Sequence, residues 1–217
     1  MAEITLPQMR EKLYSAVVCD ALDKLGLKNQ SPRVQLLPMT VQGVLIGRCK
    51  TTLWADTAHE DPRPYELELK AVDSCQPDDV VIAAAGGSMR SALWGELLST
   101  ACRRSGAVGA IVDGAVRDVV KMTQMSFACY ALATSPYDSR DRNRVIDIDV
   151  PVEIDGVQFS PGDLVIADVD GIVVVPQHVE VDAIAAAWEK VHAENVVRES
   201  IAGGMTASEA FKKYGVL

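Results

Sequence analysis

One ordered stretch in the middle of this 217-residue chain constrains its fold more than any other feature. It runs from QPDDVVIA (76–83) through GGS (86–88) and a helical pattern over 92–104 to AVGAIVD (107–113). A strand, a glycine turn, a helix and a second strand in this order predict a βαβ unit with parallel strand pairing. We therefore expect an α/β fold.

The spacing of apolar residues predicts the remaining elements. We expect a helix over 6–25, a strand over 41–53, a short helix over 66–74, several strands with hairpin turns across 145–176, and a last long helix over 181–202. No linker-like stretch interrupts this pattern, which predicts one domain over 1–217 with helices at both ends.

The pattern Pro-x-Asp-x-Val-Ile-Ala occurs twice, in QPDDVVIA (76–83) and in SPGDLVIA (160–167). Both copies predict a turn that begins with proline and is followed by a buried strand. The repeat is short, and it indicates a reused turn rather than a duplicated domain.

Composition excludes several classes of function. The chain has 21 Lys and Arg against 30 Asp and Glu, a formal charge of -9, which argues against a nucleic-acid partner. Its apolar runs are too short to cross a bilayer, and its first residues resemble no secretory signal. Five scattered cysteines without a C-x-x-C pair favour reduced, mostly buried thiols in the cytoplasm. The histidines, which also lack the spacing of zinc ligands, are His59, His178 and His192.

The start of the helix near Gly95 is the first candidate for a functional site. The free N–H groups of its first turn, at Gly95 to Leu98, form a potential anion site together with the helix dipole. An ordinary βα turn is the alternative. The sequence contains no G-x-G-x-x-G and no phosphate-binding G-K-[ST] motif, so the glycines indicate no nucleotide site.

The second candidate is the pair Arg117-Asp118, just beyond the strand that ends near Asp113. Ligands of open α/β sheets bind beyond the carboxyl ends of strands. Arg117 could hold a carboxylate or keto oxygen through its planar fork, and Asp118 could bind a hard divalent cation. The alternative is a helix-capping aspartate beside a surface arginine. One helix and one strand separate Glu96 from Arg117, so we expect Glu96 near Asp118.

These residues resemble the RraA-like family, which includes class II pyruvate aldolases acting on 4-hydroxy-4-methyl-2-oxoglutarate. The resemblance rests on Glu96-x20-Arg117-Asp118 within WGELL and VDGAVRD, and on three further segments, CDALDKLG (19–26), PVEIDGVQFSPGDLVIADVDGIVVVP (151–176) and the closing FKKYGVL. It implies a layered αββα sandwich of the swivelling β/β/α type. It also implies a homotrimer or homohexamer with the active site between subunits, and a C-terminal helix (181–204) that packs on or reaches a neighbouring subunit.

The resemblance also implies roles for single residues. Asp118 would bind Mg²⁺ or Mn²⁺ directly, Glu96 would hold metal-bound water, and Arg117 would contact the pyruvyl unit of a 2-oxo acid substrate. Gly95, Leu97 and Leu98 would receive the substrate carboxylate at the helix start. The water shell would be completed by a glutamate on the neighbouring subunit's C-terminal helix, for which Glu194 is the best match and Glu199 the second.

The activity that the family implies is metal-dependent cleavage of a 4-hydroxy-2-oxo acid to pyruvate, decarboxylation of oxaloacetate, or both. A divalent cation would stabilise the pyruvate enolate. No lysine lies in an obviously apolar context, which disfavours a Schiff-base aldolase. The alternative is a non-catalytic regulator that binds an RNA-degrading endonuclease. Such family members tend to have a shorter C-terminus, so the long final helix favours an enzyme.

Three features of the sequence allow more than one interpretation. The turn Pro77-Asp78-Asp79 replaces the family's frequent Pro-Gly-Asp and could be rebuilt. The stretch ATSPYDSRDRNRV (133–145) reads either as a solvated loop or as a segment that selects a polyanionic or hydroxylated substrate. An i, i+4 ion pair between Glu194 and Arg198 is the alternative to a metal-site role for Glu194.

Overall fold

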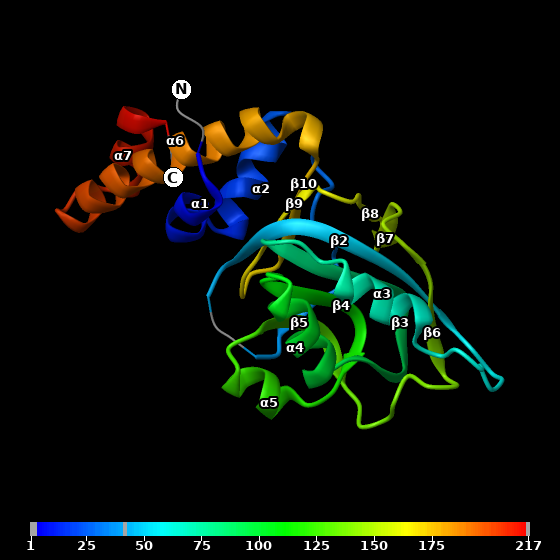
Figure 1. The fold of residues 1–217 in the computed structure, drawn as a ribbon. Helices are drawn as coiled ribbons and strands as arrows, with labels where there is room; N and C mark the ends of the chain where they lie inside the picture. Colours follow the sequence, from blue (N-terminus) through cyan, green and yellow to red (C-terminus); the bar gives the residue numbers. More distant parts are fainter. Residues whose placement is uncertain (1–3, 41–42, 216–217) are drawn as a thin grey trace.

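The computed structural model describes residues 4–40 and 43–215, which form a curled β-sheet with helices on its outer face and at both ends of the chain (Figure 1). The strands are β1 (Leu37–Pro38), β2 (Leu45–Asp56), β3 (Asp79–Trp94), β4 (Gly109–Val116), β5 (Ala128–Thr134), β6 (Asn143–Ile148), β7 (Val152–Ile154), β8 (Val157–Phe159), β9 (Leu164–Ala167) and β10 (Ile172–Val175). The helices are α1 (Leu6–Lys12), α2 (Ser15–Lys24), α3 (Glu66–Asp73), α4 (Glu96–Arg104), α5 (Val119–Gln124), α6 (Glu180–Ala202) and α7 (Ala207–Tyr214), with a 3₁₀ turn, η1 (Gln177–Val179), before α6.

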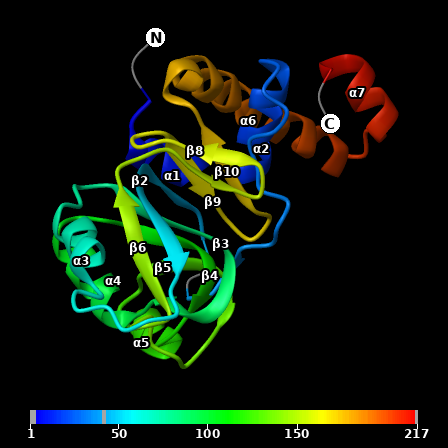
Figure 2. The ribbon, with the colours of Figure 1, turned by 90° about the vertical axis from the view of Figure 1, so that its right-hand side faces the viewer.

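The sheet is mixed, and strand β2 has partners on both of its edges. The strand order is β1-β5-β4-β3-β2-β9-β10, with β6 also paired to β2. Strands β2, β3, β4 and β5 run parallel to one another, which confirms the predicted βαβ unit. The first residues of β2 pair with β9 and its last residues with β6. Strands β9 and β6 therefore lie one after the other along the same edge of β2. Because of this change of partner, the sheet bends along β2 and curls (Figure 2).

Alternation of side chains along the strands divides the interior into three apolar layers. On β3, Val80 and Ile82 point into the curl, where they pack with the β7–β8 hairpin. Val81 and Ala83 point to the opposite face, which α3, α4 and α5 cover. On β9, Leu164 faces a third layer beneath α1, α2 and α6. The predicted layered α/β class with helices at both ends of the chain is confirmed.

The predicted single helix over 6–25 is wrong, because α1 and α2 are separated by two extended residues, Leu13 and Tyr14. Asp168, in the turn between β9 and β10, explains the break. Its Oδ2 accepts the backbone N–H of Ser15 at 2.7 Å, and its Oδ1 accepts the Ser15 hydroxyl at 2.6 Å. A carboxylate far away in the sequence thus satisfies the start of α2, where the N-cap residue is a tyrosine.

The predicted glycine turn at 86–88 and the helix predicted over 92–104 are also placed wrongly. Strand β3 continues through these glycines, and α4 begins only at Glu96. The first two glycines have φ values of 59° and 73°, which glycine adopts without steric strain, and they bend the strand. The Asp113 carboxylate accepts the Gly87 N–H at 3.0 Å and holds this bend.

Other boundaries differ less. The strand predicted over 41–53 begins at Leu45, and residues 41–42 lie outside the described part of the chain. The strand predicted over 107–113 is β4, shifted toward the C-terminus. The closing segment, for which no helix was predicted, forms α7 behind a capping box between Thr206 and Glu209. The helix over 66–74, the hairpins across 145–176 and the last long helix are confirmed. Four of the five cysteines are buried, and all five are free thiols.

The two copies of the Pro-x-Asp pattern form the same turn. Asp79 Oδ2 accepts the Gln76 N–H at 2.7 Å, and Asp163 Oδ2 accepts the Ser160 N–H at 3.0 Å. The first turn is not rebuilt, because Asp78 adopts a φ of 70° where the second copy has glycine with a φ of 84°. Aspartate tolerates this left-handed conformation better than most residues.

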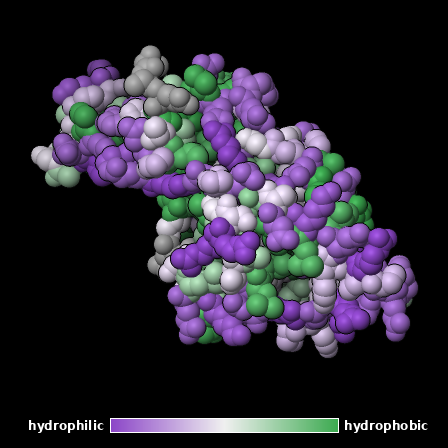
Figure 3. All heavy atoms as spheres, in the orientation of Figure 1, coloured by the Kyte–Doolittle hydropathy of each residue, from purple (hydrophilic) through white to green (hydrophobic). Residues whose placement is uncertain are grey.

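The molecule has two lobes, which Figures 1 and 2 show from two sides. The terminal helices α1, α2, α6 and α7 form one lobe, and the curled sheet with α3, α4 and α5 forms the other. Polar residues dominate the helical lobe in Figure 3, whereas apolar residues are exposed near the middle of the sheet lobe. Among the residues described, no helix has the length and apolar character needed to cross a membrane.

Candidate active site

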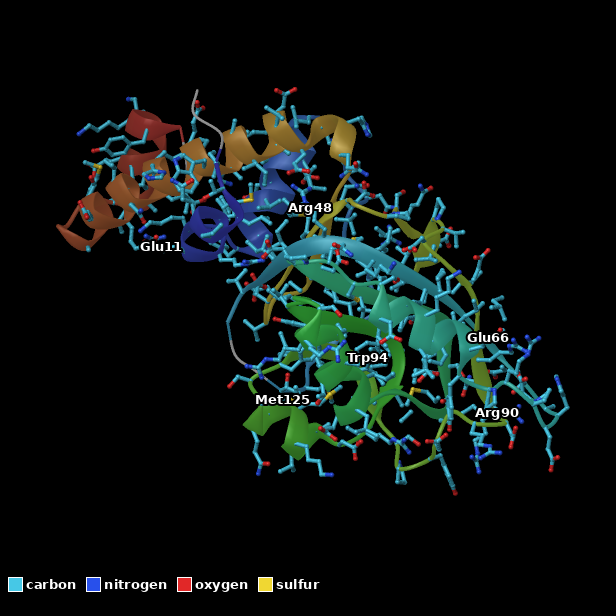
Figure 4. All side chains as sticks on the ribbon, viewed as in Figure 1. Glu11, Arg48, Glu66, Arg90, Trp94 and Met125 are labelled. Carbon is cyan, nitrogen blue, oxygen red and sulfur yellow. The ribbon has the colours of Figure 1, made fainter. Side chains whose placement is uncertain are left out.

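A cavity of about 260 Å³ opens in the sheet lobe at the carboxyl ends of β3 and β4. Its walls come from four segments: α3, the junction of β3 and α4, the turn after β4, and the loop that precedes β6. The volume lies just below the roughly 300–1,000 Å³ typical of sites for drug-sized ligands, which suits a small metabolite. Trp94 is a packing residue that adjoins the site: it is 3% exposed and lies beside α4 (Figure 4).

Gly95 makes the central geometry of this cavity sterically feasible. A Cβ atom on Gly95 would lie 2.9 Å from Asp118 Oδ2 and 3.2 Å from Arg117 Cγ. Its φ of -165° is extended backbone that any residue adopts, so space rather than conformation requires glycine here. The absence of a side chain lets the Asp118 carboxylate lie directly against the start of α4.

Arg117 lies between two carboxylates. Its backbone N–H donates to the Trp94 carbonyl at 2.9 Å, which fixes the residue to the end of β3. Its Nη2 donates to Asp138 Oδ2 at 2.6 Å, and its Nε lies 3.8 Å from Asp118 Oδ2. The side chain is 37% exposed, so the rest of the guanidinium is accessible from the cavity. Arg117 therefore lines the cavity and is paired with a carboxylate.

Asp118 has a left-handed backbone, with a φ of 58°, at the start of α5. Its side chain makes no capping hydrogen bond to α5, the helix that it precedes. Instead its Oδ2 accepts a long hydrogen bond, 3.4 Å, from the backbone N–H of Glu96. A carboxylate this weakly engaged retains lone pairs for a cation or a water molecule.

The first turn of α4 meets the cavity through its backbone and through two leucines. Leu97 and Leu98 line the cavity, and Leu97 is 75% exposed. The expected proximity of Glu96 to Asp118 is confirmed at the backbone, where the Glu96 N–H lies 3.4 Å from Asp118 Oδ2. The Glu96 carboxylate accepts the Thr100 hydroxyl at 3.0 Å and lines a neighbouring open hollow with Lys121.

Asp138, within the charged stretch 133–145, was not predicted as a site residue. Its Oδ1 accepts the Tyr65 hydroxyl at 2.6 Å and the Arg140 N–H at 2.8 Å, while its Oδ2 accepts Arg117. Burial alone would raise the pKa of Asp138, but these hydrogen bonds and the Arg117 charge lower it below its usual value. The pKa of Tyr65 rises to about 12, mainly through burial and then through its bond to Asp138. In the sequence, the alternating charges of the stretch 133–145 were the signal that could have identified Asp138 as a site residue.

Glu68 is the second residue that the sequence did not reveal. It is 7% exposed and lines the cavity from α3, and its Oε2 has no hydrogen-bond partner among the described residues. Burial raises its pKa to about 8, with a further contribution from the Asp138 charge and an opposing one from Arg117. Glu68 is therefore mostly a neutral carboxylic acid at pH 7.

Glu194 and Glu199 lie on α6, in the other lobe, and the described chain does not bring them to its own cavity. Glu194 Oε2 accepts the Tyr14 hydroxyl at 2.5 Å, and its Oε1 lies 3.5 Å from Lys190 Nζ. The alternative, an ion pair with Arg198, is wrong, because Arg198 donates to Asn195 Oδ1 at 2.6 Å instead. Contribution of either glutamate to a neighbouring subunit remains a prediction.

The donor set fits a cation that keeps most of its water. Among residues 4–40 and 43–215, no cluster of three Asp, Glu, His or Cys side chains is arranged around a common point. Asp118 offers one weakly engaged carboxylate, and Gly95 leaves space beside it. Mg²⁺ is commonly held by one or two carboxylates, with water and substrate oxygens completing six ligands. A magnesium-like ion therefore fits, whereas a site with a full set of protein ligands does not.

A larger hollow of about 890 Å³ lies between α1, α6 and the start of β2. Its charged residues are already paired: Arg48 binds Glu180 through two hydrogen bonds, and Arg10 binds Asp78 at 2.6 Å. Most of its remaining lining is apolar. We therefore place the candidate active site in the smaller cavity, where carboxylates and an arginine converge.

Comparison with known proteins finds a matching family model and several similar chains. A family model named RraA-like and described as "Aldolase/RraA" matches residues 15–174. A Halalkalibacterium halodurans protein named "Putative 4-hydroxy-4-methyl-2-oxoglutarate aldolase" is 27% identical over 210 residues, 97% of this chain and 95% of that protein. An Ectopseudomonas mendocina protein of the same name is 37% identical over 119 residues, 55% of this chain and 71% of that protein. The crystal structure of Streptomyces coelicolor RraAS2, "an unusual member of the RNase ES inhibitor RraA protein family", has a TM-score of 0.77 and 27% identity, covering 91% of this chain and 99% of that chain.

Proposed function

The chain belongs to the RraA-like family, and from this premise we propose that it is a divalent-metal-dependent lyase that releases pyruvate from a 4-hydroxy-2-oxo acid, from oxaloacetate, or from both. One observation carries the proposal: Gly95 lets the Asp118 carboxylate and the Arg117 guanidinium converge at the start of α4. This arrangement combines a cation ligand, a fixed positive charge and free backbone donors in one small cavity.

The residues divide the recognition of the pyruvyl unit among them. The N–H groups of Leu97 and Leu98, at the start of α4, are suited to the substrate carboxylate, since a helix start favours anions. Arg117 is suited to the keto oxygen, where negative charge develops during the reaction. Asp118 would hold Mg²⁺ or Mn²⁺, which would supply further positive charge to that oxygen.

The bond changes are the same for each 4-hydroxy-2-oxo acid. The C4 hydroxyl loses its proton and C4 becomes a carbonyl, while the electron pair of the broken C3–C4 bond passes to the pyruvyl fragment as an enolate. The enolate then takes up a proton at C3. With oxaloacetate, loss of CO₂ yields the same enolate without removal of a hydroxyl proton.

A water molecule is the proposed proton acceptor for the C4 hydroxyl. Glu96 and the Glu194 of a neighbouring copy are the residues we propose to hold such water. Glu96 directly follows Gly95, and its backbone N–H already lies 3.4 Å from Asp118 Oδ2, beside the proposed metal site. Two exposed apolar side chains support a homotrimer or homohexamer: Leu97, which lines the cavity, is 75% exposed, and Val120, two residues after Asp118, is 70% exposed.

Exchange of the methyl protons of pyruvate in D₂O tests the enolate step by itself. We expect NMR to show exchange that needs Mg²⁺ or Mn²⁺, stops on chelation and resumes when the metal is restored. Asp118→Ala should slow exchange by about 100-fold or more and Arg117→Lys by about tenfold or more, because an ammonium cannot replace the planar fork. The exposed variants Asp170→Asn and Arg104→Lys serve as matched controls. Exchange that survives chelation, or Asp118→Ala at the wild-type rate, would contradict the proposal.

The second candidate function is a non-catalytic regulator that binds an RNA-degrading endonuclease. The observation in its favour is the likeness to RraAS2, which extends over 91% of this chain, so the long C-terminal helix no longer separates the two functions. A coupled assay for pyruvate discriminates between them. Metal-dependent pyruvate release from oxaloacetate or a 4-hydroxy-2-oxo acid supports the lyase, whereas no release and no exchange of pyruvate protons would favour the regulator.

A further inference from the structure

The candidate cavity has two chemically different ends, which Arg117 connects. The Nε edge of the guanidinium faces Asp118 and the start of α4, where we place the pyruvyl unit. The Nη2 atom faces Asp138, which also accepts the Tyr65 hydroxyl. The remainder of a substrate, beyond its third carbon, would therefore extend toward Asp138 and the face of α3.

Glu68 gives this second end an unused hydrogen-bonding group. Tyr65, the residue before α3, and Glu68, in its first turn, are three residues apart, and both line the cavity. Glu68 is more than nine-tenths buried and lines the cavity, and its Oε2 has no partner among the described residues. A buried polar atom without a partner destabilises a fold unless a ligand or water satisfies it. As a neutral acid at pH 7, Glu68 could both donate and accept a hydrogen bond.

The charges around the cavity disfavour a second substrate carboxylate. Within the described part of the chain, the ionisable lining consists of one cation, Arg117, and three acids, Glu68, Asp118 and Asp138, besides the phenol of Tyr65. Arg117 is already bonded to Asp138 and also serves the pyruvyl unit. A second carboxylate at the Glu68 end would therefore lie beside Asp138 without a cation of its own, which is repulsive in a partly desolvated cavity.

We propose that the substrate is a 4-hydroxy-2-oxo acid with a single carboxylate and a hydroxylated, uncharged remainder, and that Glu68 is the specificity-determining residue that binds this remainder. The inference rests on the proposed lyase function and narrows its substrate class. It differs from the dicarboxylate in the names of the aldolase relatives. A hydroxyl group satisfies Glu68 Oε2, which a methyl group would leave without a partner.

Three substrates that differ only at the fifth carbon test this inference. 4,5-Dihydroxy-2-oxopentanoate carries CH₂OH there, 4-hydroxy-2-oxopentanoate carries CH₃, and 4-hydroxy-2-oxoglutarate carries COO⁻. All three release pyruvate, so one coupled assay gives kcat/KM for each. We expect the CH₂OH substrate to exceed the COO⁻ substrate by at least tenfold and the CH₃ substrate by a smaller factor. A COO⁻ substrate that is cleaved as well as the CH₂OH substrate would overturn the inference.

Substitution of Glu68 assigns the preference to this residue. In Glu68→Met, kcat/KM for the CH₂OH substrate should fall to the level of the CH₃ substrate, whereas Glu68→Gln should keep part of the preference because its amide still forms hydrogen bonds. Glu66→Gln, an exposed change on the same helix, is the matched control and should leave all three values unchanged. An unaltered CH₂OH to CH₃ ratio in folded Glu68→Met would exclude Glu68 as the determinant.

The pH dependence provides a second readout. Ionisation of Glu68 above about pH 8 adds a negative charge beside Asp138, Tyr65 and Arg117. The discrimination against the COO⁻ substrate should therefore grow between pH 7 and pH 9 in the wild type and stay constant in Glu68→Gln. Equal profiles would contradict the placement of the fifth carbon at Glu68. Failure of the lyase function itself has a separate signature, the absence of proton exchange on pyruvate.

Discussion

Gly95 determines the geometry of the candidate site at the scale of single residues. The space above its Cα is filled by Asp118 Oδ2 and by the stem of Arg117. These contacts place a carboxylate and a guanidinium beside the free N–H groups of α4, although Arg117 and Asp118 follow β4 whereas α4 follows β3. The chemistry that we propose requires all three groups within reach of one small molecule.

Gly95→Ala should abolish most activity without unfolding the protein. The added methyl group would lie 2.9 Å from Asp118 Oδ2 and must displace that carboxylate. Because the φ of -165° suits alanine, the backbone needs no change. We expect pyruvate proton exchange to fall by about tenfold or more, because a small misplacement of a reacting group slows a reaction strongly, while circular dichroism stays unchanged. Gly203→Ala, at the end of α6, is the control for replacing a glycine by alanine. Pyruvate proton exchange at the wild-type rate in Gly95→Ala would refute the steric argument.

The sequence allowed some site residues to be predicted and concealed others for physical reasons. Arg117 and Asp118 are adjacent and follow a strand of apolar residues, so their position at a sheet edge could be predicted. Asp138 lies in a loop whose path no periodicity determines, and only the structure brings it to Arg117. Glu68 belongs to a short helix whose acidic residues suggest exposure, yet it faces the cavity and is buried.

At the scale of whole elements, predictions succeeded where local pattern determines structure and failed where a distant residue does. The hairpins and the long α6 follow from turn residues and apolar spacing. The bend in β3 requires the Asp113 carboxylate to bind a strand N–H, and the break between α1 and α2 requires Asp168. Neither partner is near in sequence, so the glycines were read as a loop and the two helices as one.

Asp168→Ala should destabilise the docking of the terminal helices. The change removes two hydrogen bonds to Ser15 and leaves the start of α2 without its cap. We expect a loss of about 1–3 kcal/mol in the free energy of unfolding, measured by urea titration, and a Tm lower by several degrees. Asp170→Ala, in the same turn but exposed, is the control. An unchanged midpoint for Asp168→Ala would show that the break in the helix has another cause.

At the scale of the whole molecule, the net charge and the arrangement of the two lobes bear on the proposed activity. The chain has a formal charge of -9, so an anionic substrate gains nothing from the overall field and depends on local positive charge. Arg117 and the start of α4 supply part of that charge, and a cation on Asp118 would supply the rest. The helical lobe, with α6 and α7, projects away from the sheet lobe (Figure 1), a shape suited to contact with another subunit.

Binding of Mn²⁺ in the presence of oxalate, a planar mimic of the pyruvate enolate, tests the central claim most directly. Electron paramagnetic resonance of free Mn²⁺ measures the binding without relying on turnover. We expect one Mn²⁺ site per chain whose affinity rises when oxalate is added, and loss of that site in Asp118→Ala but not in Asp170→Asn. Equal Mn²⁺ binding by the wild type and Asp118→Ala, with no effect of oxalate, would contradict a cation held by Asp118 beside an oxo acid.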